Sequence, residues 1–406
     1  MKQKIMIPIL LFVMCPLWVL AQENTVTITA KNNLDIGRQN EAIILSKSEL
    51  RSLGEADLNH IHVKDDAGRE LICQTIDTTG DHFADAVLFQ ADFAPNQVRH
   101  FYVYAGKQQL YSKEQYKAFG RFIQERFDDF AWENDRIVQR TYGKALKTWK
   151  GGPLTSSTID VWAKNTDKLV LNDWYMTAHY HMDWGQGADL YSSGNTRGVG
   201  ADAVWNNDKL WTAENFTHSF VYGKGPIRVS FRLGYENFNV NGQEVKETRH
   251  IILDAGHNLN HFQVSYETGI EDPLQVAAGI QTSNQTPEEV RKGLEGYHRN
   301  KSVERHPGKA LQKDMNKKEG WITMVQPLSE GKLYSAIIVN PEDLIKFTRK
   351  GKNVLAIVQL EEDNKFSYWA GYSWSRSGQF EDYEAWKAHI ADVARGLQSP
   401  IKITVE

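Results

Sequence analysis

Residues 174–205, WYMTAHYHMDWGQGADLYSSGNTRGVGADAVW, hold the densest concentration of chemically active side chains in the chain. His179, His181 and Asp183 occupy alternate positions, so in an extended backbone their side chains share one face. Two imidazoles and a carboxylate can hold a transition metal, or they can move protons on an organic substrate. We favour proton transfer without a metal or other cofactor. A structural histidine in an irregular loop is the third alternative.

The same segment has glycine at positions 185, 187, 194, 198 and 200, which allows the backbone to approach a ligand closely. Asp189, Tyr191 and Arg197 lie between these glycines. A loop so rich in glycine and charge is poorly suited to building a core, which favours a binding role. We therefore expect the candidate site to include this segment.

A second cluster lies in ERFDDFAWENDRIVQRTYGKAL, residues 125–146. Arginine binds carboxylates through two parallel hydrogen bonds, so two arginines beside an indole would suit an acidic sugar. An exposed hairpin with surface ion pairs is the alternative interpretation. The candidate substrate-binding residues of this cluster are Trp132, Asn134, Arg136, Arg140 and Tyr142.

Two further groups lie later in the chain. Glu247 and Arg249 share one face of a predicted strand and could line the same cleft. In SYWAGYSWSRSG, Tyr368, Tyr372 and Trp374 share a face if the strand stays regular. These aromatic residues could form a sugar-stacking wall, but a buried core is the favoured interpretation.

These clusters need a framework, and the residue pattern predicts one that is mainly β. Residues 22–106 alternate apolar and polar side chains between turns, which predicts a small N-terminal β domain. The polar stretch 107–120 follows as a linker. Many strand-like pieces within 121–406 predict a large antiparallel sandwich that carries the site. Apolar residues at helical spacing over 380–397 predict one C-terminal helix before a last strand.

The first 21 residues have the form of a cleavable secretory signal peptide. Lys2 and Lys4 precede a long apolar run, and Ala21 supplies the small residue before the cut. The run is too short for a good membrane anchor, and the residue before Cys15 is too large for lipid attachment. We therefore expect a periplasmic protein without a membrane partner.

Net charge and cysteine content limit the possible partners and disulfide bonds of the protein. The 47 basic residues become 45 once Lys2 and Lys4 are removed, so 51 acidic residues give a net charge of −6. Nucleic acid is therefore not an expected partner. Cys73 remains as the only thiol, so no internal disulfide can form. The 12 Trp residues suit either sugar stacking or a large β core.

Several pieces of the sequence resemble domain-of-unknown-function family 4861, which occurs in bacterial gene clusters for plant and algal polysaccharide use. The resemblance implies a galactose-mutarotase-like β super-sandwich, an architecture shared by several polysaccharide lyases. It also implies carbohydrate chemistry, since some relatives are thought to act on uronic-acid oligosaccharides by elimination. Arg197 departs from the more apolar residue expected there. The pieces are FADAVLFQADF, DDFAWENDRIVQRTYG, HYHMDWGQGADLYSSGNTRGVGA, ETRHIILDAGHNLN and YWAGYSWSRSGQF.

Elimination requires a group for the uronate carboxylate, a base for the C5 proton and an acid for the leaving oxygen. Under the resemblance, Arg249 or Arg140 would hold the carboxylate, His181 would be the base and Tyr191 the acid, with His179 supporting either. The enzyme would be a carbon–oxygen lyase acting on acidic oligosaccharides. If the C4 oxygen is unsubstituted, the same chemistry releases water and makes the enzyme an oligosaccharide dehydratase.

Two other functions stay open at this point. A mutarotase-like epimerase would use a histidine acid and a carboxylate base, for which Glu247 is the candidate. A non-catalytic glycan-binding protein would need only the aromatic residues and arginines. The periplasmic location favours exo-type trimming of short acidic glycans. The glycan, its linkage and the oligomeric state are left open by the sequence.

Overall fold

The protein is described by a computed structural model, and β-strands are its main secondary structure. The predicted signal peptide lies outside the described ranges. Within those ranges no helix is long and apolar enough to cross a membrane. The structure describes residues 24–54, 57–150, 153–177, 180–282, 312–328 and 330–406.

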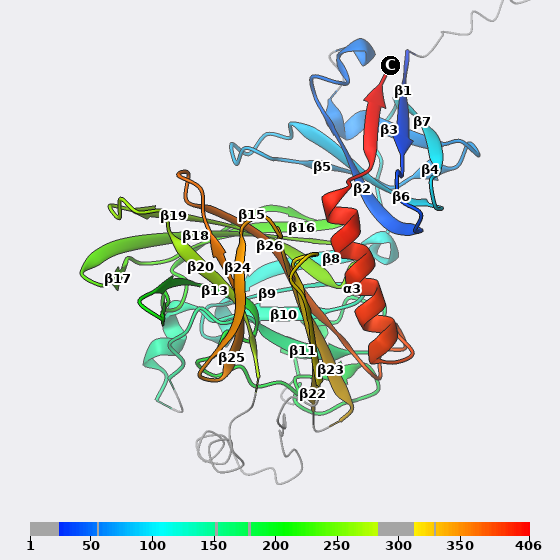
Figure 1. The fold of residues 1–406 in the computed structure, drawn as a ribbon. Helices are drawn as coiled ribbons and strands as arrows, with labels where there is room; N and C mark the ends of the chain where they lie inside the picture. Colours follow the sequence, from blue (N-terminus) through cyan, green and yellow to red (C-terminus); the bar gives the residue numbers. More distant parts are fainter. Residues whose placement is uncertain (1–23, 55–56, 151–152, 178–179, 283–311, 329) are drawn as a thin grey trace, which may run out of the picture.

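The N-terminal part is a small sandwich of two sheets, seen at the top of Figure 1. Its strands alternate buried and exposed side chains, as in β1, where Val26, Ile28 and Ala30 are buried. One sheet has the order β27 (Lys402–Val405), β1 (Thr25–Lys31), β7 (Val98–Ala105), β3 (Ile61–Asp65), β4 (Glu70–Leu71). The other has the order β2 (Arg38–Ser46), β6 (Ala86–Phe93), β5 (Cys73–Ile76).

The end of the chain returns to this N-terminal sheet. β27 pairs antiparallel with β1, with Ile28 opposite Val405. The sequence-based division assigned these last residues to the larger part, and it counted 118–120 as linker although β8 begins at Ala118. β27 joins the small sandwich because the preceding helix ends beside it, where the edge of β1 is open to pairing (Figure 1).

The larger part is the β super-sandwich, which consists of three antiparallel sheets. The longest has the order β15 (His218–Lys224), β16 (Arg228–Gly234), β18 (Gln243–Asp254), β19 (Leu259–Thr268), β26 (Lys365–Trp374), β23 (Lys332–Val339), β22 (Trp321–Pro327), β21 (Gln312–Asn316), with β17 (Phe238–Val240) on β18. A five-stranded sheet has the order β12 (Gly187–Ala188), β11 (Asp160–Lys164), β10 (Val138–Thr141), β9 (Asp129–Asn134), β8 (Ala118–Ile123). Another has the order β14 (Lys209–Trp211), β13 (Val199–Asn206), β20 (Gln275–Gln281), β25 (Asn353–Gln359), β24 (Leu344–Lys350).

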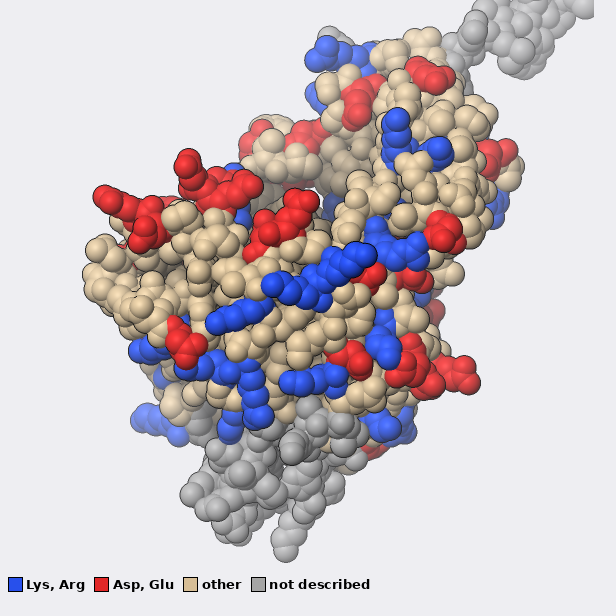
Figure 2. Space-filling view, in the orientation of Figure 1, with Lys and Arg blue, Asp and Glu red and all other residues tan. Residues whose placement is uncertain are grey.

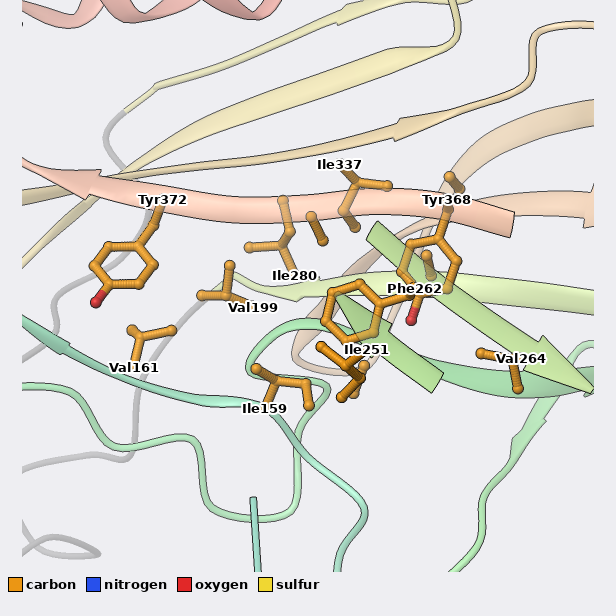
Figure 3. Packing of buried hydrophobic residues seen from close by; sticks show 14 of the residues in the cluster. Ile159, Val161, Val199, Ile251, Phe262, Val264, Ile280, Ile337, Tyr368 and Tyr372 are labelled. Atoms are coloured by element: carbon orange, nitrogen blue, oxygen red, sulfur yellow. The ribbon is translucent and has the colours of Figure 1, made fainter. Parts of the chain in front are cut away.

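One hydrophobic core joins these three sheets. Figure 3 shows Val161, Phe262, Ile280 and Ile337 converging from different sheets on the same interior. Burial of each such side chain contributes about 1.5–3 kcal/mol. Gly200 allows β13 and β26 to approach closely, because a Cβ at this position would lie 2.3 Å from the Cβ of Ala370. The favoured interpretation of the aromatic group as buried core is confirmed, since Tyr368, Tyr372 and Trp374 all lie in this core, and the alternative of a sugar-stacking wall, with Trp374 as a substrate-binding residue, is corrected.

The predicted C-terminal helix is α3 (Tyr383–Gln398), drawn in red in Figure 1. The Asp382 carboxylate accepts a hydrogen bond from the Ala385 backbone N–H at 2.9 Å and so caps the helix. Trp386, Ile390 and Ala394 pack against β22 and β23 on the outside of the super-sandwich. The Trp386 indole N–H donates to Thr323 Oγ1 at 2.7 Å.

The predicted fold class is confirmed. The chain is mainly β, with antiparallel sheets and one C-terminal helix of several turns. A short helix, α1 (Leu171–Tyr175), was not predicted. Figure 2 shows basic and acidic side chains mixed over the visible face, with a band of Lys and Arg across the super-sandwich below its junction with the N-terminal part.

Candidate functional site

The outer face of the five-stranded sheet formed by β8 to β12 is unusually polar. Along β9, β10 and β11 the side chains alternate, and Trp132 and Val161 point into the core. Asp129, Arg140 and Asp160 lie on the opposite face, with Arg140 directly beside Asp160 in the strand register. All three are buried, because the segment that carries α1 and the following loop covers this face. The sheet thus places an arginine between acids under a loop.

Arg140 bridges two carboxylates that are far apart in sequence. Its Nε donates to Asp160 Oδ2 at 2.9 Å and its Nη2 donates to Asp189 Oδ2 at 3.1 Å. The Tyr142 hydroxyl also donates to Asp160, at 3.1 Å. Burial by itself would lower the pKa of Arg140. The attraction of the Asp189 and Asp160 carboxylates outweighs this effect and raises the pKa well above its usual value. This arginine is therefore always charged.

His181 connects this buried cluster to solvent. Its Nδ1 lies 3.1 Å from Asp189 Oδ2, and its side chain is 25 % exposed whereas that of Asp189 is fully buried. Burial raises the pKa of Asp189 to about 6, against the lowering effect of Arg140. A carboxylate at Nδ1 fixes the ring orientation and stabilises the imidazolium. We call the set Arg140, Tyr142, Asp160, His181 and Asp189 the Arg140 network.

Aromatic rings line the network on one side. Tyr180 stacks on Trp162 with ring centroids 5.1 Å apart and an interplanar angle of 16°, and Trp162 stacks on Trp174 at 5.5 Å. The guanidinium of Arg126, in the 3-10 turn η4 (Gln124–Arg126), lies 5.6 Å from the Tyr180 ring centroid. Arg126 is half-buried, so a second cation lies near the exposed edge of the site.

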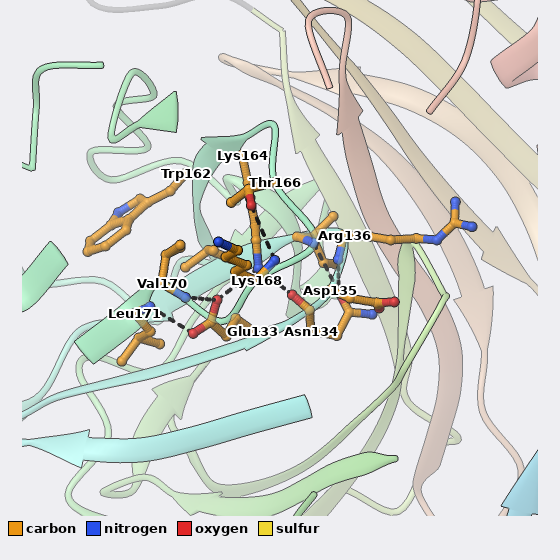
Figure 4. Close-up of polar contacts among 12 residues, drawn as sticks. Glu133, Asn134, Asp135, Arg136, Trp162, Lys164, Thr166, Lys168, Val170 and Leu171 are labelled. Carbon is orange, nitrogen blue, oxygen red and sulfur yellow. Dashed lines mark hydrogen bonds and ion pairs between the residues drawn. The ribbon is translucent and has the colours of Figure 1, made fainter. Parts of the chain in front are cut away.

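A buried ion pair anchors the covering segment (Figure 4). Lys164 Nζ lies 2.9 Å from Glu133 Oε2, and both side chains are almost fully buried. The same carboxylate accepts hydrogen bonds from the backbone N–H groups of Val170 and Leu171, at 2.9 and 2.7 Å. A negative charge at the N-terminus of α1 is favourable. Glu133 therefore fixes where the loop that carries His181 starts.

Glycines bring the end of the same loop onto β11. Gly187 has a φ of +106°, and a Cβ there would lie 2.0 Å from the Ala163 carbonyl oxygen. Gly198, with a φ of +56°, would clash in the same way with the Ile159 carbonyl oxygen at 1.8 Å. Only glycine fits these close approaches, which place Asp189 over the sheet.

The metal-binding alternative, formed by His179, His181 and Asp183, lies only partly within the described residues. His179 lies outside the described residues. The Asp183 carboxylate accepts hydrogen bonds from the backbone of Gly185 and Gly187, at 2.7 and 2.9 Å, and so shapes its own turn. His181 instead faces Asp189. In the described part of the chain no group of three His, Cys, Asp or Glu residues is placed to hold a metal ion.

Arg249 and Glu247 lie in a separate, sealed network between the sheets. Arg249 Nη2 lies 2.6 Å from Asp202 Oδ1 and 2.8 Å from Glu247 Oε1, and all three side chains are 0 % exposed. The Tyr266 hydroxyl donates to Asp202 Oδ2 at 2.5 Å. Burial, with the charge of Asp202, raises the pKa of Glu247 to about 8. The expectation that Glu247 and Arg249 line a cleft is corrected. The sheet that contains β13, on which Asp202 lies, covers the face that they share. We call this set the Arg249 network.

Arg197 and Tyr191 are also buried. Arg197 donates to the Ser156 and Ser157 hydroxyls and to the Asp202 carbonyl, at 3.0, 3.1 and 3.0 Å. Burial, together with the charge of Arg249, lowers its pKa to about 10. Tyr191 is 1 % exposed and belongs to the main hydrophobic core. The structure therefore places both outside the solvent-accessible edge of the site.

The remaining predicted residues lie elsewhere. The Trp132 indole donates to Asn260 Oδ1 at 2.8 Å within the core, and the Trp374 indole donates to the Glu330 carbonyl at 2.8 Å. Asn134 donates to two backbone carbonyls, at 2.6 and 2.7 Å, and holds the β18–β19 turn against β9. The Arg136 side chain extends away from Glu133 and Lys164 (Figure 4). Of the second cluster, only Arg140 and Tyr142 join the network.

Sequence reasoning missed several members of the site. Asp160 and Trp162 share one face of a strand that was predicted, so their alternation could have identified them. Asp129 could have been found in the same way, as an acid on the outer face of β9, opposite to the core residues Phe130 and Trp132. Burial raises the pKa of Asp129 to about 7. Tyr180 and Arg126 gave no signal, because only the folded loop brings them together.

Comparison with other proteins gives one relative of similar length and two longer solved structures. "Uncharacterized protein P7" from Formosa agariphila is 28 % identical over 390 residues, which cover 93 % of each protein. A solved protein in the glycosyl hydrolase family 38 from Enterococcus faecalis has a TM-score of 0.51 at 9 % identity, over 95 % of this chain. An alpha-mannosidase from Enterococcus faecalis V583 gives 0.49 at 9 % identity, over 95 % of this chain and 46 % of its own.

These solved structures are larger than this protein. The chain spans about half the length of the glycosyl hydrolase family 38 protein, 48 % of it. At 9 % identity the similarity concerns the fold alone. A super-sandwich architecture can carry many chemistries, so the fold does not decide the reaction.

A protein-family model covers both parts of the molecule. The model described as "Domain of unknown function (DUF4861)" matches residues 30–403. This range includes most of the N-terminal sandwich, the super-sandwich and the whole Arg140 network. The resemblance inferred from the sequence pieces is thereby confirmed. The chain belongs to domain-of-unknown-function family 4861.

Proposed function

We propose that the protein is an exported lyase that cleaves a carbon–oxygen bond in uronic-acid oligosaccharides by β-elimination. The observation that carries this proposal is the geometry of His181, which faces the buried Asp189 at 3.1 Å on one side and is 25 % exposed on the other. An imidazole held in this way is suited to exchange a proton with a bound substrate. Family membership and the shared fold favour a carbohydrate substrate.

In the proposed step, the second ring nitrogen of His181 takes the proton from C5 of the uronate. The C5–H electron pair becomes the C4–C5 double bond, and the bond between C4 and its oxygen breaks. The departing oxygen takes up a proton. Asp189 stabilises the imidazolium that forms, and Arg140 holds Asp189 in place from behind.

Two half-buried residues at the edge of the network would complete the reaction. Arg126 is the cation best placed for the uronate carboxylate, because Arg140 is 6 % exposed and already bridges two acids. Tyr180, whose ring centroid lies 4.2 Å from that of His181, replaces Tyr191 as the proposed acid. Trp184 is 70 % exposed and offers a surface for sugar stacking.

The test is to incubate the mature protein with a panel of uronic-acid oligosaccharides and follow the absorbance of the unsaturated uronate. His181→Ala is expected to lower kcat/KM by about 10²- to 10⁴-fold, the usual contribution of a general base. His218→Ala is the matched control, since His218 is an exposed histidine on β15 and its loss should leave activity unchanged.

Mass spectrometry separates the two forms of the reaction. Loss of one water without chain cleavage would identify a dehydratase, and cleavage with a new double bond would identify an oligosaccharide lyase. No unsaturated product across the panel, or full activity of His181→Ala, would refute the proposal. A change in anomer ratio without a double bond would then favour the mutarotase alternative.

A further inference from the structure

A large cavity lies where the N-terminal sandwich meets the super-sandwich. It has a volume of about 1070 Å³ and lies between β2, the outer face of the longest sheet, and α3. We call it the junction cavity. No member of the Arg140 network lines it. Its volume is slightly above the usual range for ligand pockets, roughly 300–1,000 Å³, and the elimination proposed above does not use it.

The floor of the junction cavity is a row of polar side chains on three adjacent strands. Ser230 Oγ lies 2.7 Å from His250 Nε2, and His250 Nδ1 lies 3.1 Å from Gln263 Oε1. Burial lowers the pKa of His250 to about 4, so the ring is neutral at neutral pH. Hydroxyl, amide and neutral imidazole groups can each donate and accept hydrogen bonds. A floor of this kind suits the hydroxyl groups of a sugar.

Aromatic rings stand beside this floor. His261 and Trp369 are cross-strand neighbours and stack at 4.3 Å with an interplanar angle of 5°. Tyr222 packs on His250 with centroids 4.8 Å apart. Trp369 and Tyr222 are only half-buried although they lie under the N-terminal sandwich. Flat half-exposed rings beside polar groups are the usual composition of a carbohydrate subsite, because the C–H faces of sugars are apolar.

The cavity also holds a cation without a carboxylate partner among the described residues. The Arg136 guanidinium lines the cavity, and its side chain donates only to the Asn258 amide oxygen, at 3.2 Å. The acids around the cavity are engaged elsewhere. Asp254 accepts from Arg228, and Glu41 accepts from Arg38.

The other acids on the cavity wall are occupied as well. The Asp77 carboxylate accepts backbone hydrogen bonds from Gly80 and His82, at 2.6 and 2.9 Å, within its own turn. Asp92 accepts from the Asn40 backbone N–H at 2.8 Å, and Asp392 lies 3.6 Å from Arg395 Nη1. Asp77 and Asp92 keep their negative charge, so the positive charge offered to a ligand is local to the Arg136 guanidinium.

We propose that the junction cavity is a second glycan-binding site, in which Arg136 binds the carboxylate of a uronic-acid residue and the Ser230–His250–Gln263 row binds its hydroxyl groups. Trp369 and Tyr222 supply stacking surfaces. The site is built by both parts of the chain, since residues of β2, of the longest sheet and of α3 all line it. It binds the same class of ligand as the His181 site without using His181.

The test uses the full mature chain with His181→Ala, which prevents turnover, and measures binding of tetragalacturonate by calorimetry. The His181 site and the junction cavity should each give a binding event. Adding Arg136→Gln is expected to weaken binding in the junction cavity by about 10- to 100-fold, as for loss of a charge-assisted hydrogen bond. Arg349→Gln is the matched control, because Arg349 is an exposed arginine on β24 away from the cavity, and it should leave binding unchanged.

Hydrogen exchange locates the ligand independently of Arg136. Tetragalacturonate should slow exchange in residues 250–263 and 367–369, and Gln263→Trp, which fills the cavity from an exposed position on its floor, should abolish this effect. Equal binding of the neutral cellotetraose would refute the role of Arg136. Unchanged binding in both Arg136→Gln and Gln263→Trp, or protection confined to residues 174–205, would refute the site itself.

Discussion

The Arg140 and Arg249 networks use the same residue types in two different surroundings. Each places one arginine between two carboxylates and adds a tyrosine hydroxyl. The Arg249 network ends inside the super-sandwich at Tyr266, with every charged member 0 % exposed. The Arg140 network ends at His181, which reaches solvent. The difference lies in what covers each sheet face.

The covering layer decides what each arginine can do. A second sheet seals Arg249, so its charges can only hold strands together and specify how they pack. A loop covers Arg140, and a loop leaves an edge through which a ligand can reach His181. An arginine between two acids is therefore no evidence of a binding site unless one member of its network is accessible.

The largest expected effect is the loss of stability on replacing Arg249. Arg249→Met leaves Asp202 and Glu247 buried without their cation, so we expect the free energy of unfolding to fall by about 3–5 kcal/mol. Urea denaturation followed by tryptophan fluorescence would measure it. The folded fraction should keep its specific activity. A variant that is stable but inactive would show that the Arg249 network takes part in catalysis and would break the comparison.

A smaller effect, on activity, is expected from Asp189→Asn. The imidazolium of His181 would lose the carboxylate that stabilises it, so kcat/KM should fall by about 10- to 100-fold. The acidic limb of its pH profile should move to lower pH by about one unit. Asp202→Asn in the sealed network is the control, since it should change stability without moving the profile. Parallel pH profiles for wild type and Asp189→Asn would rule out the positioning role.

The smallest effect is a difference in how stability depends on pH. Burial raises the pKa of Glu247 to about 8, above the ordinary value of 4.5 that the unfolded chain would have. The folded chain therefore holds a proton that the unfolded chain releases. The free energy of unfolding should then fall as pH rises towards 8, by at most about 1.4 kcal/mol per pH unit from this group.

Glu247→Gln should make this slope shallower between pH 7 and 8. The acids of the Arg140 network, Asp160 and Asp189, have pKa values raised only to about 6, so they add little slope in that window. Lys246→Ala is the matched control, because Lys246 is next to Glu247 on β18 and its exposed pair with Glu267 on β19 should contribute less than about 1 kcal/mol. An unchanged slope in Glu247→Gln would show that Glu247 is ionised in the fold.

The sequence by itself determined the strands, the C-terminal helix and the family. Period-two alternation predicted the β-rich architecture, and helical spacing predicted α3. The glycine-rich segment around His181 and Asp189 was also identified in advance, because its composition is poor for a core. These features are local, so neighbouring residues are enough to predict them.

Only the tertiary structure decided which charged residues remain accessible. Alternation shows that Glu247 and Arg249 share a face, but it does not show that another sheet covers that face. It likewise gives no sign that Arg140 meets Asp189, 49 residues further along the chain. The junction cavity depends on a still longer connection, since Arg38 on β2 meets Gly396 on α3, 358 residues further along the chain. Burial and contact between distant segments are properties of the packed sheets, and no local pattern encodes them.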